Sequence, residues 1–296
     1  MAWLSCSSGI IIINRYILTE LQFGYPMALS ALGQLVSCVV ALIICDVFKM
    51  VPLVEIDMEY FLQRIAPVGA AHGIGLWVSN QLYLLLTVSF IEMARSLMPL
   101  FTVLALWAAK VEIPTNEHIQ AVSLTGVGCG ISAYGEVALS SLGLIFLAAN
   151  FAIEAGRMVM LQFLMQGHNM NPWQTLKLMS LPAGGMLVLM TLIVESKEMA
   201  TKNADAIVLA NWPAFVAAGT LGLCVNILGN LIIKLSNATS VKLLAAVRGP
   251  MVVVSGVVLF SETVTGIQLF GYSLALAAFV WYNVLAAKSL LKRLET

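Results

Sequence analysis

The sequence predicts an all-α integral membrane protein with ten transmembrane helices, arranged as two inverted five-helix repeats. Hydrophobic residues make up 60% of the 296 residues and charged residues only 10%, whereas about 25% of residues are charged in an ordinary soluble domain. Apolar runs recur along the whole chain, each close to the ~20 residues that a helix needs to cross a ~30 Å hydrocarbon core. A residue spacing that recurs in both halves of the chain predicts the repeats.

Ten apolar segments are predicted to be the membrane-spanning helices. In chain order they cover residues 2–19, 25–48, 65–86, 88–110, 118–134, 137–164, 174–194, 212–234, 239–260 and 266–287. Turn and helix-breaking residues separate them, and the charged segment 195–205 is predicted to be the connection between the seventh and the eighth. The fifth is rich in Gly, Ala and Ser between residues 123 and 132, a composition that favours close helix packing.

The repeats are predicted from a proline, a glutamate and a threonine at nearly the same spacing in each half. They are Pro99, Glu112 and Thr115 in the first half and Pro250, Glu262 and Thr265 in the second. The chain is then a single transporter domain with repeats at 1–134 and 135–296. Because five is an odd number, the second repeat must be inverted in the membrane. Such an architecture places a substrate site near the bilayer midplane, between the halves.

Cations outnumber carboxylates inside the predicted spans. The cations are Arg15, Arg95, Arg157, Lys242 and Arg248, and the carboxylates are Glu92 and Glu154. A charged side chain at the bilayer centre costs ~2.5–3.5 kcal/mol on insertion scales. Five cations against two carboxylates therefore predict a shared cavity with excess positive charge, which suits an anion.

Each of these polar residues also has a structural interpretation. Glu154 and Arg157 share one helix face and form either a structural ion pair or a pair that exchanges partners when an anion arrives. Arg95 either faces substrate or pairs with Glu92. Arg248 is too deep to reach the interface easily, so we expect it to line the cavity.

For two further cations and three neutral residues, the sequence does not decide between a role in substrate binding and a structural role. Lys242 and Arg15 lie nearer to helix ends, where they either bind substrate or extend to the interface. Asn80, Tyr83 and Asn230 suit sugar hydroxyls but serve equally well as hydrogen-bonding contacts between helices.

Several short motifs resemble the sugar-phosphate/phosphate translocators, a triose-phosphate translocator-like family of the drug/metabolite transporter superfamily. They are Asn14-Arg15, the turn 23–27, the stretch from Trp77 through Tyr83, Ser89-Phe90, the sequence MARSLMP at 93–99, Tyr134-Gly135-Glu136 and EAGRMVMLQ at 154–162. Arg248 aligns with a substrate-binding lysine of that family. The next residue, often Arg, Asp or Thr there, is Gly249, which departs from a standard triose-phosphate pattern.

The resemblance and the buried charge together predict a secondary active antiporter that exchanges phosphorylated sugars or related organic phosphates for a counter-anion across an organelle membrane. The alternative is a nucleotide-sugar/nucleotide monophosphate antiporter. An exporter of neutral or cationic metabolites is disfavoured by the buried cations. An enzyme is disfavoured because no nucleophile–base pair or metal cluster occurs at helical spacing. We expect no cofactor, no metal and no nucleic-acid partner, while a monomer and a homodimer both stay open.

Loop charges predict the orientation in the lipid bilayer. If the N-terminus is cytosolic, eight basic residues fall in cytosolic loops and tails, against Lys197 and Lys202 on the opposite side. This bias follows the positive-inside rule and places both termini in the cytosol. No signal or transit peptide is recognised, which together with the resemblance favours the Golgi or another endomembrane, with a plastid envelope as the alternative.

Overall fold

The structure is a computed structural model that describes residues 2–98, 101, 116–136, 140–168, 170–235 and 238–294. Within these ranges the side chains of residues 158–159, 162–168, 238–243, 245–247 and 286–294 lie outside the description. Every regular element in the described part is a helix or a helical turn, which confirms the all-α prediction.

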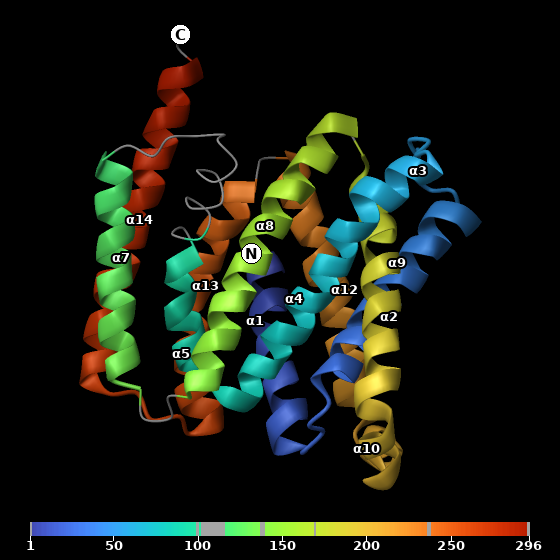
Figure 1. The fold of residues 1–296 in the computed structure, drawn as a ribbon, viewed down its shortest axis with the longest axis horizontal. Helices are drawn as coiled ribbons and strands as arrows, with labels where there is room; N and C mark the ends of the chain where they lie inside the picture. The colour runs from blue at the N-terminus through green and yellow to red at the C-terminus, as the bar shows by residue number, and fades with distance from the viewer. Residues whose placement is uncertain are drawn as a thin grey trace. The chain divides into compact units, whose positions relative to one another are not determined.

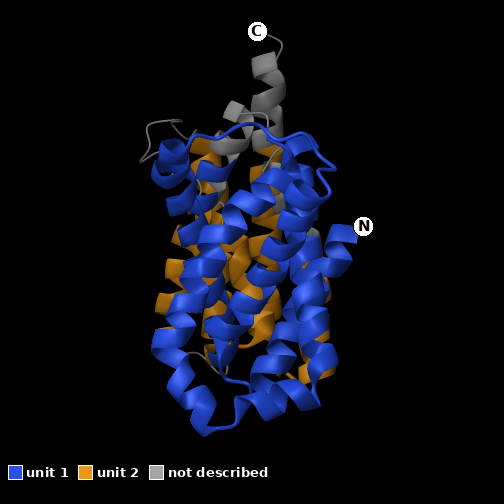
Figure 2. Ribbon diagram, turned by 90° about the vertical axis from the view of Figure 1, so that its right-hand side faces the viewer, with its two compact units in different colours: residues 1–84, 157–244 blue, residues 85–156, 245–296 orange. Residues whose placement is uncertain are grey.

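The chain forms two compact units, each built from two separate stretches of sequence (Figure 2). Unit 1 comprises residues 1–84 and 157–244, and unit 2 comprises residues 85–156 and 245–296. Each unit therefore takes helices from both halves of the chain. The inverted repeats at 1–134 and 135–296 stay a prediction, because Pro99, Glu112 and Thr115 lie outside the described residues.

The helices are labelled in Figure 1. Unit 1 contains α1 (Ala2–Arg15), η1 (Tyr16–Glu20), α2 (Pro26–Leu42), η2 (Ile43–Val47), α3 (Met58–Tyr60), η3 (Phe61–Ile65), α4 (Ala66–Leu85), α9 (Pro172–Met190), η5 (Thr191–Glu195), α10 (Ser196–Thr201), α11 (Ala204–Ala210) and α12 (Trp212–Leu235). Unit 2 contains α5 (Val88–Ala94), η4 (Arg95–Leu97), α7 (Asn116–Tyr134) and α14 (Gly266–Leu294). Two helices contribute long stretches to both units, α8 (Ser141–His168) and α13 (Ala238–Phe260), and the last residue of α4, Leu85, belongs to unit 2.

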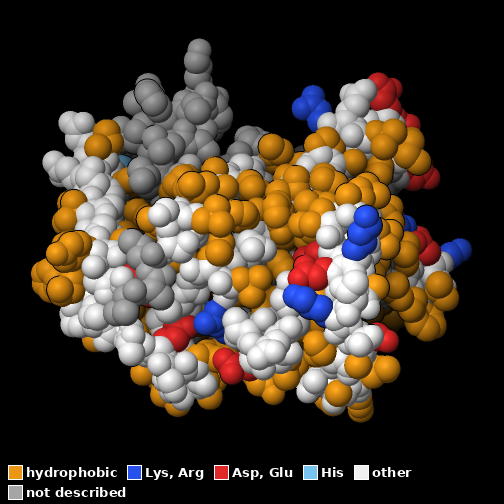
Figure 3. Space-filling view, turned by 60° about the horizontal axis from the view of Figure 1, so that its bottom comes forward, with side chains coloured by type: hydrophobic (Ala, Val, Ile, Leu, Met, Phe, Trp, Pro, Cys, Tyr) orange, Lys and Arg blue, Asp and Glu red, His pale blue; other side chains and the backbone are white. Residues whose placement is uncertain are grey.

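Four described helical stretches are long and apolar enough to cross a membrane. They are Pro26–Val47, Pro172–Thr201, Trp212–Leu235 and Gly266–Leu285, and they coincide with the second, seventh, eighth and tenth predicted segments. Hydrophobic side chains cover much of the face shown in Figure 3, with charged side chains confined to a few places. The chain is thus a membrane protein, while the number of ten spans stays a prediction.

In unit 1, a distant carboxylate fixes the start of α2. Pro26 occupies the first turn of α2, where the missing N–H of proline is no loss. The Glu195 carboxylate at the end of η5 accepts hydrogen bonds from the backbone N–H groups of Met27 (2.9 Å) and Ala28 (2.8 Å). Glu195 thereby satisfies amides that have no partner within the helix.

The connection predicted at 195–205 contains one short helix and the start of another. Residues Ser196–Thr201 form α10, and α11 starts at Ala204. The two helices meet at Asn203, which has a positive φ of 50°. Glu198 and Lys202 form an exposed ion pair (2.6 Å) at the i, i+4 spacing that supports a helix.

In unit 2, α7 and α14 lie side by side (Figure 1). Their backbones approach so closely that a Cβ added to Gly128 would lie 2.5 Å from the backbone nitrogen of Ala275. A Cβ added to Gly271 would lie 2.5 Å from the backbone nitrogen of Ser132. The prediction that the small residues of the fifth segment mediate close packing is confirmed.

Candidate anion-binding site

Three charged side chains of unit 2 form a buried cluster, Arg95–Glu92–Arg248, which we call the arginine pair site. Glu92 lies on α5, Arg95 on η4 and Arg248 in the middle of α13. One Glu92 carboxylate oxygen lies 2.9 Å from the Arg248 guanidinium, and the other lies 3.2 Å from the Arg95 guanidinium. The side chains of Glu92 and Arg248 are 1% and 6% exposed, whereas that of Arg95 is 26% exposed.

The start of α5 holds Glu92 in place. Thr87 caps α5 by accepting the N–H of Phe90 at 3.2 Å. The Glu262 carboxylate, which follows α13, accepts the N–H groups of Val88 (2.8 Å) and Ser89 (2.9 Å). It also accepts the Ser89 hydroxyl at 2.6 Å. Because Glu92 lies one turn further along α5, these bonds fix its carboxylate relative to α13.

A second carboxylate, that of Glu136, forms hydrogen bonds at the same end of unit 2. Glu136, which follows α7, accepts hydrogen bonds from the Thr87 hydroxyl (3.2 Å) and the Gln268 amide (2.6 Å). The Thr265 hydroxyl donates to the backbone carbonyl of Gly135 at 3.0 Å. The helix ends beside the arginine pair site are therefore joined by a continuous set of hydrogen bonds, which favours a rigid site.

Among the described residues of the arginine pair site, one carboxylate faces two guanidinium groups. Breaking a buried ion pair costs about 3–5 kcal/mol, since the remaining charge is left without its partner. Glu92 divides its two oxygens between the arginines, one facing Arg95 and the other facing Arg248. Arginine binds carboxylate and phosphate with the same planar, two-pronged geometry. An incoming phosphate can therefore replace Glu92 as the partner of either guanidinium.

In unit 1, the predicted site residues Asn80, Tyr83 and Arg15 join helices. Asn80 on α4 accepts a hydrogen bond from Asn14 on α1 (3.1 Å) and donates one to Ser30 on α2 (2.8 Å). The Arg15 guanidinium donates to the backbone carbonyl of Tyr83. Each of these contacts joins two helices of unit 1, and the binding role of these residues stays a prediction.

The remaining predicted site residues are Asn230, Glu154, Arg157 and Lys242. Asn230 on α12 donates to the backbone carbonyl of Pro172 at 3.5 Å, a contact between helices of unit 1. Glu154 and Arg157 are half-buried on α8, with Glu154 in unit 2 and Arg157 in unit 1. Lys242 lies on α13, but its side chain is outside the described residues.

Sequence reasoning missed Tyr272, a buried residue of α14 beside the arginine pair site. Its side chain packs with Met93 of α5 and Val253 of α13. A Cβ added to Gly249 would lie 2.6 Å from the Tyr272 hydroxyl oxygen. A tyrosine on an apolar helix ordinarily indicates packing, so the sequence carried no signal for this position.

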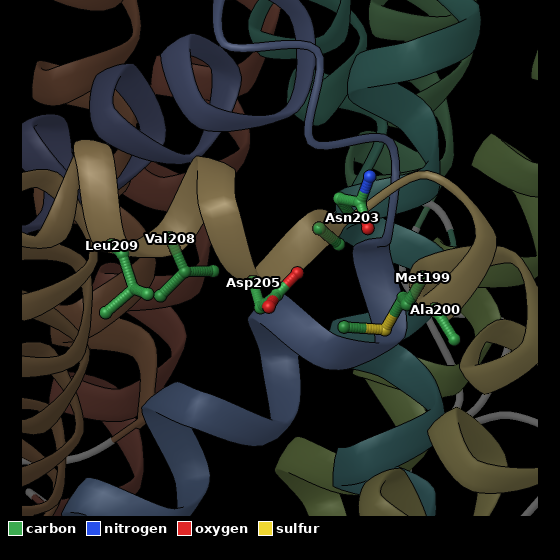
Figure 4. A pocket seen from close by; sticks show the side chains of 7 residues that line it. Met199, Ala200, Asn203, Asp205, Val208 and Leu209 are labelled. Atoms are coloured by element: carbon green, nitrogen blue, oxygen red, sulfur yellow. The ribbon is translucent and has the colours of Figure 1, made fainter.

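A pocket of about 730 Å³ lies on α10 and α11, but it does not suit an anion (Figure 4). Its wall includes Met199, Asn203, Asp205, Val208 and Leu209. The wall carries one carboxylate, that of Asp205, and no lysine or arginine. A phosphate there would meet a like charge, which disfavours binding.

Comparison with known proteins assigns the chain to a family. The profile described as the Triose-phosphate Transporter family matches residues 1–283. This chain belongs to that family. The resemblance predicted from the sequence motifs is therefore confirmed, and membership of a transporter family favours a carrier over an enzyme.

Several relatives are probable sugar phosphate/phosphate translocators of Arabidopsis thaliana. One is 27% identical over 96% of this chain and 85% of its own length. A second is 28% identical over 95% of this chain and 81% of its own length. A third is 26% identical over 97% of this chain and 77% of its own length. A protein of known crystal structure shares the fold, with a TM-score of 0.59 and 16% identity over 100% of this chain and 99% of that chain.

Proposed function

We propose that this protein is a secondary active antiporter that exchanges phosphorylated sugars or related organic phosphates across an organelle membrane. The observation that carries the proposal is the arginine pair site, in which two guanidinium groups share one buried carboxylate. A phosphate ester carries up to about two negative charges and several acceptor oxygens, which match the excess charge and the donors of Arg95 and Arg248. The names of the relatives support phosphorylated sugars as the substrate class.

Exchange, rather than one-way transport, follows from the same charge balance. Unneutralised cations repel each other strongly where the dielectric constant is low. The empty carrier therefore rearranges slowly, and a bound anion lowers the barrier by neutralising the site. Each inward step with one anion then requires an outward step with another.

We propose that further cations complete the substrate path. They are Lys242, Arg157 and Arg15, with Asn80, Tyr83 and Asn230 as neutral hydrogen-bonding groups and Glu154 as the charge partner of Arg157. The loop charges support cytosolic termini, and we propose a Golgi or other endomembrane location.

Transport by purified protein in lipid vesicles tests the proposal. Vesicles preloaded with inorganic phosphate should take up labelled phosphate, and unloaded vesicles should not. Equal uptake in both would refute exchange. Competition by nucleotide monophosphates instead of sugar phosphates would favour the nucleotide-sugar alternative.

Arg248→Ala should reduce this uptake by about 100-fold, or about 2.7 kcal/mol, as expected for losing charge-assisted hydrogen bonds to the anion. Arg248→Lys keeps the charge but loses the planar guanidinium group, so its uptake should lie between that of Arg248→Ala and that of the wild type. Arg64→Ala, which removes an exposed arginine of η3, is the matched control and should transport normally. A folded Arg248→Ala variant with wild-type uptake would remove Arg248 from the site.

A further inference from the structure

Two of the five cysteines meet at the contact between α1 and α12. These helices pack against each other in unit 1. The thiol of Cys6 on α1 and the thiol of Cys224 on α12 form a side-chain hydrogen bond. Both cysteines are free thiols in the structure. The two sulfur atoms are therefore in contact, although the residues lie far apart in the sequence.

The packing on either side of the two thiols agrees with this contact. A Cβ added to Gly9 would lie 3.3 Å from a methyl carbon of Leu221. A Cβ added to Gly229 would lie 3.6 Å from the indole nitrogen of Trp3. The early part of α1 thus faces the later part of α12, so the two helices run antiparallel. In each helix the cysteine lies between these two contacts, and the helix register places the thiols opposite each other.

Cys6 and Cys224 also differ from the other three cysteines in exposure. Both are partly exposed, whereas Cys38, Cys45 and Cys129 are buried. A cysteine within a helix contact ordinarily serves as a small apolar side chain, and this role is enough to explain the buried three. Two accessible thiols in contact can also react with each other.

We propose that Cys6 and Cys224 form a reversible disulfide bond between α1 and α12 when a hydroperoxide reaches them in the membrane. One sulfur attacks the terminal oxygen of the hydroperoxide, the O–O bond breaks, and the thiol proton passes to the departing oxygen, which leaves as an alcohol. The resulting sulfenic acid is attacked by the second sulfur. The S–S bond forms, the S–O bond breaks, and the second thiol proton leaves with the hydroxide as water. The two thiols lose two electrons in total, and the hydroperoxide gains them.

The dithiol is the resting state of this pair. Cys6 lies in the first half of α1, and the loop charges predict a cytosolic N-terminus. Thiols on the cytosolic side are kept reduced, so a disulfide there forms in response to an oxidant and is removed again. The bond needs neither substrate nor transport, and its formation is independent of the anion that the protein carries.

Oxidation of the native protein tests the proposal. Purified protein in lipid vesicles is treated with cumene hydroperoxide, and its peptides are analysed by mass spectrometry without reducing agent. The peptides that contain Cys6 and Cys224 should be joined, with the loss of two hydrogen atoms, and dithiothreitol should separate them. Cys6→Ala and Cys224→Ala should each give no joined peptide. Cys38→Ala, at a buried cysteine of α2, is the matched control and should form the bond as the wild type does.

The bond should also stabilise the protein. It closes the loop between residues 6 and 224, and a disulfide across a long loop restricts the unfolded chain. The oxidised wild type should therefore unfold at a temperature about 5 °C or more above that of the reduced wild type. Hydroperoxide should leave the unfolding temperature of Cys6→Ala unchanged.

Four results would overturn the proposal. The first is native oxidised protein without a joined Cys6–Cys224 peptide. The second is a bond that forms only after denaturation in SDS, because the thiols would then not meet in the folded protein. The third is equally fast joining of either cysteine to Cys38, Cys45 or Cys129, which would show no preference for this pair. The fourth is an unchanged unfolding temperature in protein that carries the bond, since the bond would then not join α1 to α12 in the native fold.

Discussion

Replacing Glu92 by glutamine should destabilise the protein by removing the charge that Arg95 and Arg248 share. Glutamine has nearly the same shape, but its neutral amide removes the carboxylate that both guanidinium groups face. Glu92 and Arg248 are almost fully buried, so losing their pairing should cost about 3–5 kcal/mol. The contribution of Arg95 is smaller, below about 1 kcal/mol, because water screens its 26% exposed side chain. The expected total is therefore about 4 kcal/mol.

Phosphate should reverse part of this loss. An anion between the two arginines replaces the missing carboxylate, and a ligand at 100 times its Kd stabilises the native state by about 2.7 kcal/mol. Because phosphate no longer competes with Glu92, it should bind Glu92→Gln more tightly than the wild type. Thermal unfolding of detergent-solubilised protein, followed by tryptophan fluorescence with increasing phosphate, measures both effects.

Two results would refute this reasoning. One is a Glu92→Gln variant that unfolds at the wild-type temperature without phosphate. The other is an equal stabilisation of wild type and variant by phosphate, which would mean that Glu92 and phosphate do not compete for the same guanidinium groups. Glu20→Gln, at an exposed carboxylate of η1, is the control and should match the wild type in both measurements.

Two further predictions concern packing and helix ends, and the same unfolding measurement checks both. Gly128→Ala should destabilise the protein by about 1–3 kcal/mol or more, since its Cβ would collide with the α14 backbone. Gly126→Ala, on the same helix with nothing within 4 Å of its Cβ position, should be neutral or slightly stabilising, and equal effects would contradict the packing argument. Glu195→Gln should cost about 1–2 kcal/mol by weakening its bonds to two backbone N–H groups of α2. Glu198→Gln, whose side chain is 57% exposed, should stay within about 0.5 kcal/mol, and a larger loss there than at Glu195 would overturn the capping role.

Local features of the sequence predicted much of the fold. Apolar runs located the helices, and the small residues around Gly128 correctly indicated close packing. The segment 195–205 was predicted only as a connection between spans, and its short helices α10 and α11 were not foreseen. The i, i+4 pair of Glu198 and Lys202 was the signal for a helix there.

Partnerships between distant residues could not be predicted from the sequence. Apolar flanking residues identified Arg248 and Glu92 as buried, but the two lie 156 positions apart. The sequence therefore did not decide whether Arg95 contacts substrate or pairs with Glu92. The structure adds that Glu92 faces both Arg95 and Arg248. Tyr272 and Glu195 carried no local pattern that separates them from ordinary packing or loop residues.

The carboxylates that cap α2 and α5 have a consequence for biosynthesis. The amide of Met27 leaves the ribosome 168 residues before its acceptor Glu195, and that of Val88 leaves 174 residues before Glu262. While translation continues, the nascent chain must satisfy these amides with water or lipid headgroups. The early helices reach their final hydrogen bonding only when the later ones have been synthesised, so a ribosome stalled halfway holds a chain that is inserted but not yet assembled.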